Sequence, residues 1–310
     1  MSRAGGYGAA LAMTPYLLIK VSWVVGALAG VLPTGSDASV AEWVVLNGVT
    51  IVMAAVGIVL ALALVRPWGM RIPAPPLALA AWVGAGFLVS VLPFALVTTV
   101  AGDDDSGDMP AWEGALIQAA FVTTGLGLAL ALPGYVRRRW PHLRTGRLGA
   151  PARRWVLAAG ALPGVCWLYW AAGGTVGLAH PDQRDADWRM LTLLGGLWAL
   201  TATAAVWARP PRRLPLVALG WLGSGSLFAW SGWKLPLTGY VALAEPADAV
   251  PPEHPAVAAA LHAVAVVAGV SLLRVLTRGT GLRRDEFTDH GRNEPAGRLG
   301  RPGDPEPDQQ

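Results

Sequence analysis

Cysteine, lysine and charged residues in general are scarce in this chain of 310 residues. The single cysteine, Cys166, excludes a disulfide framework and a cysteine-based zinc site. Charged residues make up 14% of the chain, against about 25% in soluble globular domains. Hydrophobic residues make up 54%. This composition argues against a soluble globular protein and favours a membrane protein.

Long apolar runs account for most of the chain. A membrane-spanning helix needs about 20 mostly apolar residues. Eight stretches meet this requirement: 11–32, 43–65, 77–100, 111–133, 155–177, 188–208, 214–236 and 256–277. The first run is longer than the apolar core of a cleavable signal peptide, so we expect it to be retained. The sequence therefore predicts an all-α fold, a polytopic membrane protein with eight transmembrane helices.

Basic and acidic residues alternate between successive loops. Arginines follow the second, fourth, sixth and eighth runs, whereas the intervening loops hold acidic residues such as Asp104 and Asp185. Loops rich in arginine stay in the cytoplasm. The sequence thus predicts a multi-pass protein of the plasma membrane with both termini cytoplasmic.

Motifs of the first half recur in the same order in the second half. The matched pairs are Lys20-x-x-Trp23-x-x-Gly26 with Trp167-x-x-Trp170-x-x-Gly173, Arg66-Pro67 with Arg209-Pro210, and Trp82-x-Gly84-x-Gly86 with Trp221-x-Gly223-x-Gly225. Chance similarity between apolar segments does not readily produce tryptophan, glycine and Arg-Pro matches in one order. We therefore predict an internal duplication.

The duplication divides the chain into four parts. These are a first four-helix membrane repeat (1–136), a basic cytoplasmic linker (137–154), a second four-helix membrane repeat (155–278) and a disordered cytoplasmic tail (279–310). Each repeat has an even number of spans, so the two are expected to be parallel, related by an axis along the membrane normal. The seam between the repeats is the expected place for a cavity. The tail has too few apolar residues to fold.

Lys20 is one of only two lysines and lies inside the first apolar run. Counted from residue 11, it lies about 13 Å deep, near the middle of a hydrocarbon core about 30 Å thick. An intramembrane lysine costs about 2.5–3.5 kcal/mol and normally faces protein or water. Tyr16 and Trp23 share its helical stripe, and Trp23 is placed for a cation–π contact. The functional interpretation is a ligand contact, and the structural one is a lysine that snorkels or fixes packing.

Four more polar residues in the predicted spans are candidates. Gln118 is nearest to Lys20 in depth, whereas Glu113 is expected at the external mouth on another face of the helix. Asn47 is expected to hydrogen bond between helices. His262 is the only histidine well inside a span, so it is either a packed core histidine or a proton relay. Haem and metal sites need several ligands, so no metal and no cofactor are predicted.

The Lys20-x-x-Trp23-x-x-Gly26 pattern, the Trp170-x-x-Gly173-Gly174 pattern and the repeated Arg-Pro and Trp-x-Gly-x-Gly motifs resemble multi-pass membrane proteins of actinobacteria. The resemblance covers residues 11–277. It implies an eight-helix integral membrane fold. It brings no established activity, so it assigns no catalytic residue.

The sequence favours a protein that binds or translocates a small amphipathic or anionic molecule near Lys20, at the repeat interface. This includes export of, or self-protection against, a secreted metabolite. The alternatives are a membrane-embedded enzyme acting on a lipid or isoprenoid, and a non-catalytic scaffold. The expected partners are the lipid bilayer and a small-molecule ligand, with no nucleic acid. The cytoplasmic loops are nearly pure in arginine, which argues against metal-dependent diphosphate chemistry.

Overall fold

The computed structural model describes residues 2–31, 39–101, 111–139, 152–208, 214–244 and 250–277. Within these ranges the regular elements are α1 (Ser2–Leu28), α2 (Val40–Val65), the short 3-10 helix η1 (Pro67–Met70), α3 (Ala74–Ala101), α4 (Ala111–Arg139), α5 (Arg154–Ala171), the short 3-10 helix η3 (Pro181–Gln183), α6 (Ala186–Trp207), α7 (Leu214–Ala244) and α8 (Pro255–Thr277). The predicted all-α class is confirmed. The linker from residue 140 and the tail 279–310 lie outside the described residues, as does Arg209-Pro210.

Six of the described helices, α1, α2, α3, α4, α6 and α8, are long and apolar enough to cross a membrane. Large apolar side chains such as Leu11, Leu18, Val45 and Val52 are exposed on the outer surfaces of α1 and α2. Extensive exposed apolar surface is unusual for a soluble monomer and typical of contact with lipid. The helices therefore indicate an integral membrane protein. That α5 and α7 also cross, giving eight spans, stays a prediction.

Several helices begin or end away from the predicted limits. Helix α1 begins at Ser2 rather than at residue 11, and α7 continues to Ala244 rather than ending at residue 236. Helix α5 ends at Ala171 instead of continuing to residue 177. Its end has a local cause, because Gly173, two residues after the helix, adopts a φ angle of 110°, which glycine tolerates and other residues rarely do.

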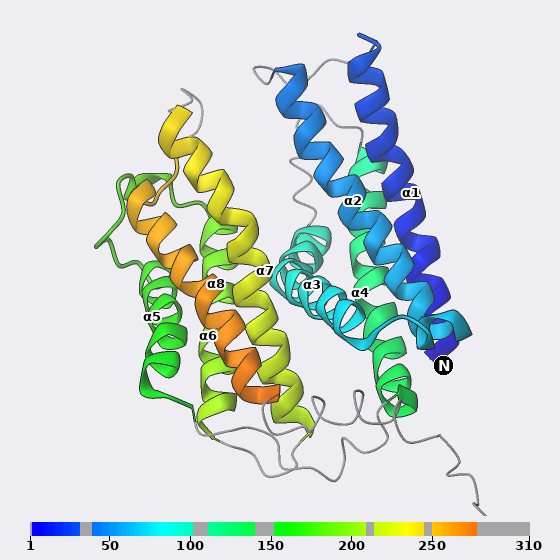
Figure 1. Cartoon of the computed structure of the whole chain (residues 1–310). Coiled ribbons are helices and arrows are strands. Elements are labelled where there is room, and N and C mark those ends of the chain that lie inside the picture. Colours follow the sequence, from blue (N-terminus) through cyan, green and yellow to red (C-terminus); the bar gives the residue numbers. More distant parts are fainter. Residues whose placement is uncertain are drawn as a thin grey trace, which may run out of the picture.

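The helices form two groups, with α5, α6, α7 and α8 in one and α1, α2 and α4 in the other (Figure 1). Helix α3 runs obliquely between the groups. In the first half the pairs α1–α2, α1–α4, α2–α3, α2–α4 and α3–α4 pack together, and the corresponding pairs among α5–α8 pack in the second half. The duplication and the superposition of the two halves stay predictions.

The halves meet where α3 packs against α7 and α6. At the centre of this seam Gly86 of α3 lies directly against Gly225 of α7, so close that a Cβ on Gly86 would overlap the Gly225 carbonyl group. Both glycines occupy the same place in the repeated Trp-x-Gly-x-Gly motif. The motif thus brings the two backbones together.

Side chains complete the seam on either side of these glycines. The Trp82 indole nitrogen donates to the Ser224 hydroxyl over 3.2 Å, and its ring stacks on Phe228 with centroids 4.8 Å apart. The Ser90 and Ser226 hydroxyls are 2.8 Å apart. At these residues the seam is closely packed, which corrects the expectation of a cavity there.

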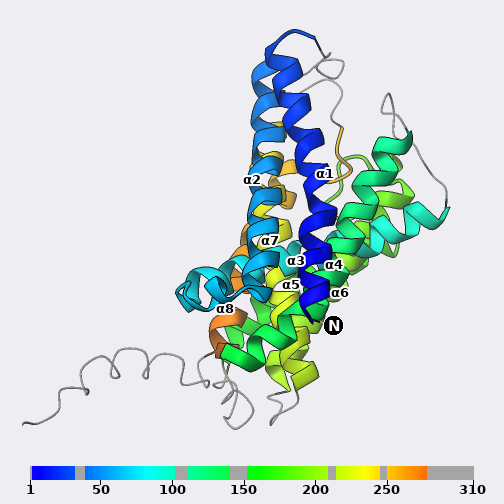
Figure 2. The same cartoon turned by 90° about the vertical axis from the view of Figure 1, so that its right-hand side faces the viewer.

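Charges of opposite sign lie at opposite ends of the first half. Where α1 begins and α2 and α4 end, at the lower end of Figure 1, the Arg138 guanidinium donates to the Leu64 carbonyl over 2.8 Å, and Arg139 donates to the Ile72 carbonyl over 2.8 Å. At the other end Glu42 accepts hydrogen bonds from the N-cap Ser39 of α2. Figure 2, turned by 90°, shows the N-terminus at the same lower end.

Candidate functional site

Helices α1, α2 and α4 pack in a register that sets the level of Lys20. The ring of Tyr16 on α1 lies 5.2 Å from that of Phe121 on α4, and Tyr16 shares a buried cluster with Ala54 of α2. Further toward the start of α1, the Thr124 hydroxyl donates to the Ala9 carbonyl over 3.3 Å. Residue numbers thus fall along α4 as they rise along α1. Lys20 is therefore level with the first turns of α4.

The Lys20 ammonium lies between α1 and α2. Its Nζ donates to Asn47 Oδ1 over 3.1 Å, and it lies 3.7 Å from the Trp23 ring centroid and 5.8 Å from the Tyr16 ring centroid. The side chain is half-buried. An ammonium carries three N–H donors. Within the described part of the chain, one of them has a hydrogen-bond acceptor.

Asn47 is held so that its oxygen faces Lys20. Its amide nitrogen donates to the Trp43 carbonyl one turn earlier, over 2.9 Å, and the side chain is only 3% exposed. The Trp43 ring packs against that of Trp23 with centroids 5.9 Å apart. The predicted interhelical role of Asn47 is confirmed. The sequence did not identify its partner, because the register between α1 and α2 depends on packing.

Glu113 lies in the first turn of α4 and is 8% exposed. It interacts electrostatically with Lys20. Among the described residues no ion pair within 4.0 Å joins the two, and no hydrogen bond of the Glu113 carboxylate is present. Gln118, favoured from its depth in the sequence, is half-buried and makes no hydrogen bond to Lys20 in the described part. Glu113 is thus the charged residue of α4 that interacts electrostatically with Lys20.

Lys20 lies closer to the middle of α1 than to its end. It precedes the last residue, Leu28, by eight positions, about 12 Å, whereas the middle of the helix at residue 15 is five positions away. The expected place of Lys20 at the interface between the halves needs correction. Helix α1 packs on α2 and α4, whereas the interface is built mainly by α3, α6 and α7, with a further contact where the Tyr240 hydroxyl of α7 donates to Glu42 of α2 over 2.6 Å.

His262 lies in the other half of the molecule and does not join Lys20. Its Nδ1 is 3.1 Å from the Ser231 hydroxyl, and its ring packs 5.5 Å from that of Trp167. His262 is 8% exposed and Ser231 is fully buried. The arrangement is that of a packed, hydrogen-bonded core histidine.

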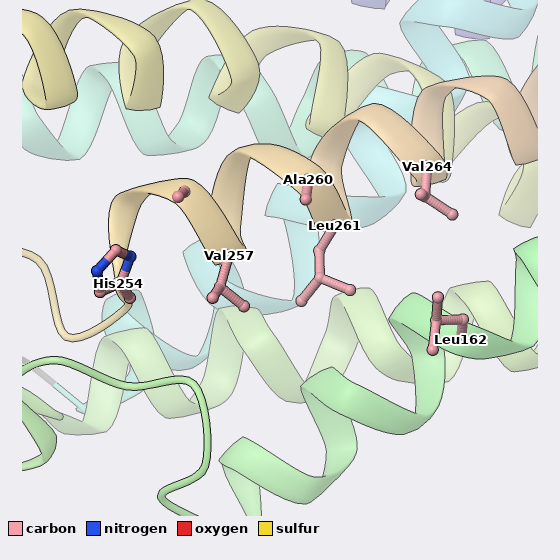
Figure 3. Close-up of a pocket in the computed structure, with 7 residues that line it drawn as sticks. Leu162, His254, Val257, Ala260, Leu261 and Val264 are labelled. Carbon is pink, nitrogen blue, oxygen red and sulfur yellow. The ribbon is translucent and has the colours of Figure 1, made fainter.

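An apolar groove of about 450 Å³ opens between α5 and α8 on the outside of the second half (Figure 3). It is lined by Leu162, His254, Ala256, Val257, Ala260, Leu261 and Val264. A similar groove of about 460 Å³ lies between α5 and α6. Neither contains a predicted site residue. Neither groove could be identified from the sequence, since alanine-rich helix surfaces are frequent in apolar helices.

No known protein family, curated protein or solved structure matches this chain. In the part that the structure describes, no three His, Cys, Asp or Glu residues are grouped so that they hold a metal ion. The similarity to actinobacterial membrane proteins stays a prediction. What the Lys20 region does has to be argued from its own geometry.

Proposed function

We propose that this chain is an integral protein of the plasma membrane that binds, or binds and translocates, a small amphipathic molecule through an anionic group at Lys20. One observation carries the proposal. A half-buried ammonium is fixed by Asn47 and Trp23 between apolar helices, with a single hydrogen-bond acceptor among the described residues.

The energetics favour a ligand at this position. A lysine within a membrane span costs about 2.5–3.5 kcal/mol and is usually paired. Asn47 supplies a neutral acceptor, and charge-assisted bonds to an anion are roughly twice as strong as neutral ones. The rings of Tyr16 and Trp23 border the ammonium and provide apolar contact for the rest of an amphipathic molecule.

The proposal includes eight membrane crossings with both termini in the cytoplasm. It is supported by the position of the arginines, because Arg66, Arg138 and Arg139 gather at the end of the first half where α1 begins. Arginines close to span ends are held on the cytoplasmic side. The Lys20 site then lies toward the external side of the membrane.

A membrane-embedded enzyme is the less favoured alternative. Serine beside histidine is an arrangement that supports nucleophilic catalysis, and Ser231 lies beside His262. Ser231 is fully buried among packed helices, so a substrate does not reach its hydroxyl. Binding at Lys20 therefore has better support than catalysis in the second half.

Thermal unfolding in dodecyl maltoside tests the proposal. The probes are dodecanoate, dodecyl phosphate and lauroyl lysophosphatidylethanolamine, which share an apolar chain and an anionic group. At least one probe should raise the Tm of the wild-type protein and leave the Tm of Lys20→Met unchanged. The matched control is Lys234→Met, which removes the chain's other lysine, itself 5.5 Å from a tryptophan ring, Trp230. The proposal fails if every probe acts equally on wild type and Lys20→Met.

A further inference from the structure

The Lys20 site contains two opposite charges that do not touch. Lys20 and Glu113 interact electrostatically, yet no ion pair within 4.0 Å joins them in the described residues. Glu113 is more than nine-tenths buried as a residue, and its carboxylate makes no hydrogen bond to a described residue. No enclosed side-chain oxygen of the described residues lacks a partner, so the carboxylate oxygens of Glu113 open onto accessible space. Something with a positive charge or N–H donors is the natural complement of Glu113.

The helix register supports the same geometry independently of the electrostatics. Tyr16 packs on Phe121, so Lys20 is level with about residue 117 of α4, and Glu113 lies one turn nearer the start of α4 on the same stripe as Ile117 and Phe121. The Lys20 Nζ lies 3.7 Å from the ring centroid of Trp23, about one turn further along α1, which brings it toward the level of Glu113. The ammonium and the carboxylate thus approach the same level of the bundle from different helices.

A simple anion suits this space poorly. It satisfies the free N–H groups of Lys20 but is repelled by Glu113, since like charges at short range in a medium of low dielectric constant repel strongly. A simple cation meets the reverse problem at Lys20. Only a ligand with both charges satisfies both side chains at once.

We propose that the Lys20 site takes a zwitterionic amphipathic molecule, with its anionic group at Lys20 and its ammonium group at Glu113. The inference rests on the proposed function and narrows its ligand class. Tyr16 and Trp23 border the ammonium, Phe121 packs on Tyr16, and these rings are available to the apolar part of the ligand. Both a lipid headgroup of the phosphoethanolamine type and a free zwitterion have this chemistry.

Charge selectivity is the test. Probes with chains of equal length are lauroyl lysophosphatidylethanolamine (zwitterion), dodecyl phosphate (anion) and dodecylamine (cation), each titrated in dodecyl maltoside while Tm is followed. The wild-type protein should respond to the zwitterion at a concentration about tenfold lower than to either single-charge probe. Glu113→Gln should abolish or invert the preference over dodecyl phosphate, since it removes the repulsion. Lys20→Arg, which keeps the charge, should retain a response to the zwitterion.

The outcomes separate this inference from the proposed function. Suppose that dodecyl phosphate raises Tm at the same concentration as the zwitterion, and that Glu113→Gln leaves the ratio of these concentrations unchanged. The zwitterionic ligand is then overturned, while anion binding at Lys20 stands. If no probe acts in a manner that depends on Lys20, both fall. Because the readout is a ratio between probes within one variant, a general loss of stability in a variant does not mimic the expected result.

A chain-free probe, O-phosphoethanolamine, distinguishes the two sources. A Tm rise that depends on Lys20 and Glu113 supports a free zwitterion as ligand. A response confined to the lysophospholipid supports a lipid headgroup. Lack of any response to both overturns the inference.

Discussion

Asn47 is the residue on which the position of the Lys20 ammonium depends. Its side-chain oxygen accepts from Lys20, and its side-chain nitrogen donates to the Trp43 carbonyl. These two bonds restrict the orientation of the side-chain amide. Asn47 is therefore a positioning residue, and its effect should be coupled to that of Lys20.

A double-mutant cycle measures this coupling. Asn47→Leu keeps the approximate volume but leaves the Lys20 ammonium without its acceptor, so we expect a loss of about 1–3 kcal/mol in the free energy of unfolding. Adding Lys20→Met removes the ammonium that lacks an acceptor and should restore part of the lost free energy of unfolding. Unfolding of the four proteins in one detergent gives the cycle. Strictly additive effects would show that the two side chains act independently.

The sequence was sufficient to find the Lys20 stripe but not the residues opposite it. Tyr16 and Trp23 follow from helical periodicity within one helix, and both lie at the ammonium. Glu113 was expected at the external mouth, on another face of the helix from Gln118, and its interaction with Lys20 depends on how α1 packs on α4. Small residues and Arg3 continue α1 back to Ser2, so Lys20 lies five positions beyond the middle of the helix at residue 15. Composition alone does not locate such a helix start.

At the scale of elements, the contact between α3 and α7 joins the two halves. The repeated glycine motif was evident in the sequence as an equivalence between halves. The sequence did not show that the equivalent glycines, Gly86 and Gly225, contact each other, since matching motifs identify corresponding positions but not which positions are in contact. The end of α5 was also not predicted: Gly173 was expected inside a span, but its positive φ angle lies just after the helix.

Alanine at the seam tests this packing. Gly86→Ala places a methyl group in the Gly225 backbone, so we expect a loss of about 1–3 kcal/mol in stability, seen as a lower Tm. Gly84→Ala is the matched control, since a Cβ there lies 3.9 Å from the Leu60 side chain and is accommodated. Equal Tm values for the two variants would contradict the close approach of α3 and α7.

At the scale of the whole molecule, the alternation of loop charge could be predicted from the sequence because it depends only on where the charged residues lie along the chain. The six long apolar helices agree with most of the predicted spans. The position of the Lys20 site relative to the seam could not be predicted, because it depends on which helices of the two halves pack against each other.

The proposed topology is tested by reporter fusions. A reporter active only in the cytoplasm should give signal when fused after Gly279 and none when fused after Gly107, because the first follows a basic span end and the second lies in an acidic loop. A reporter active only outside the cytoplasm serves as the reciprocal control. The reverse pattern of signals would refute cytoplasmic termini.

Native mass spectrometry of the protein released from its own membrane tests the central claim, ligand binding at Lys20, most directly. The wild-type protein and Lys234→Met should each retain a bound small molecule of the same mass. The Lys20→Met protein should lose that species while remaining folded in the same detergent. An identical set of bound species in wild type and Lys20→Met, or none in either, would contradict the claim.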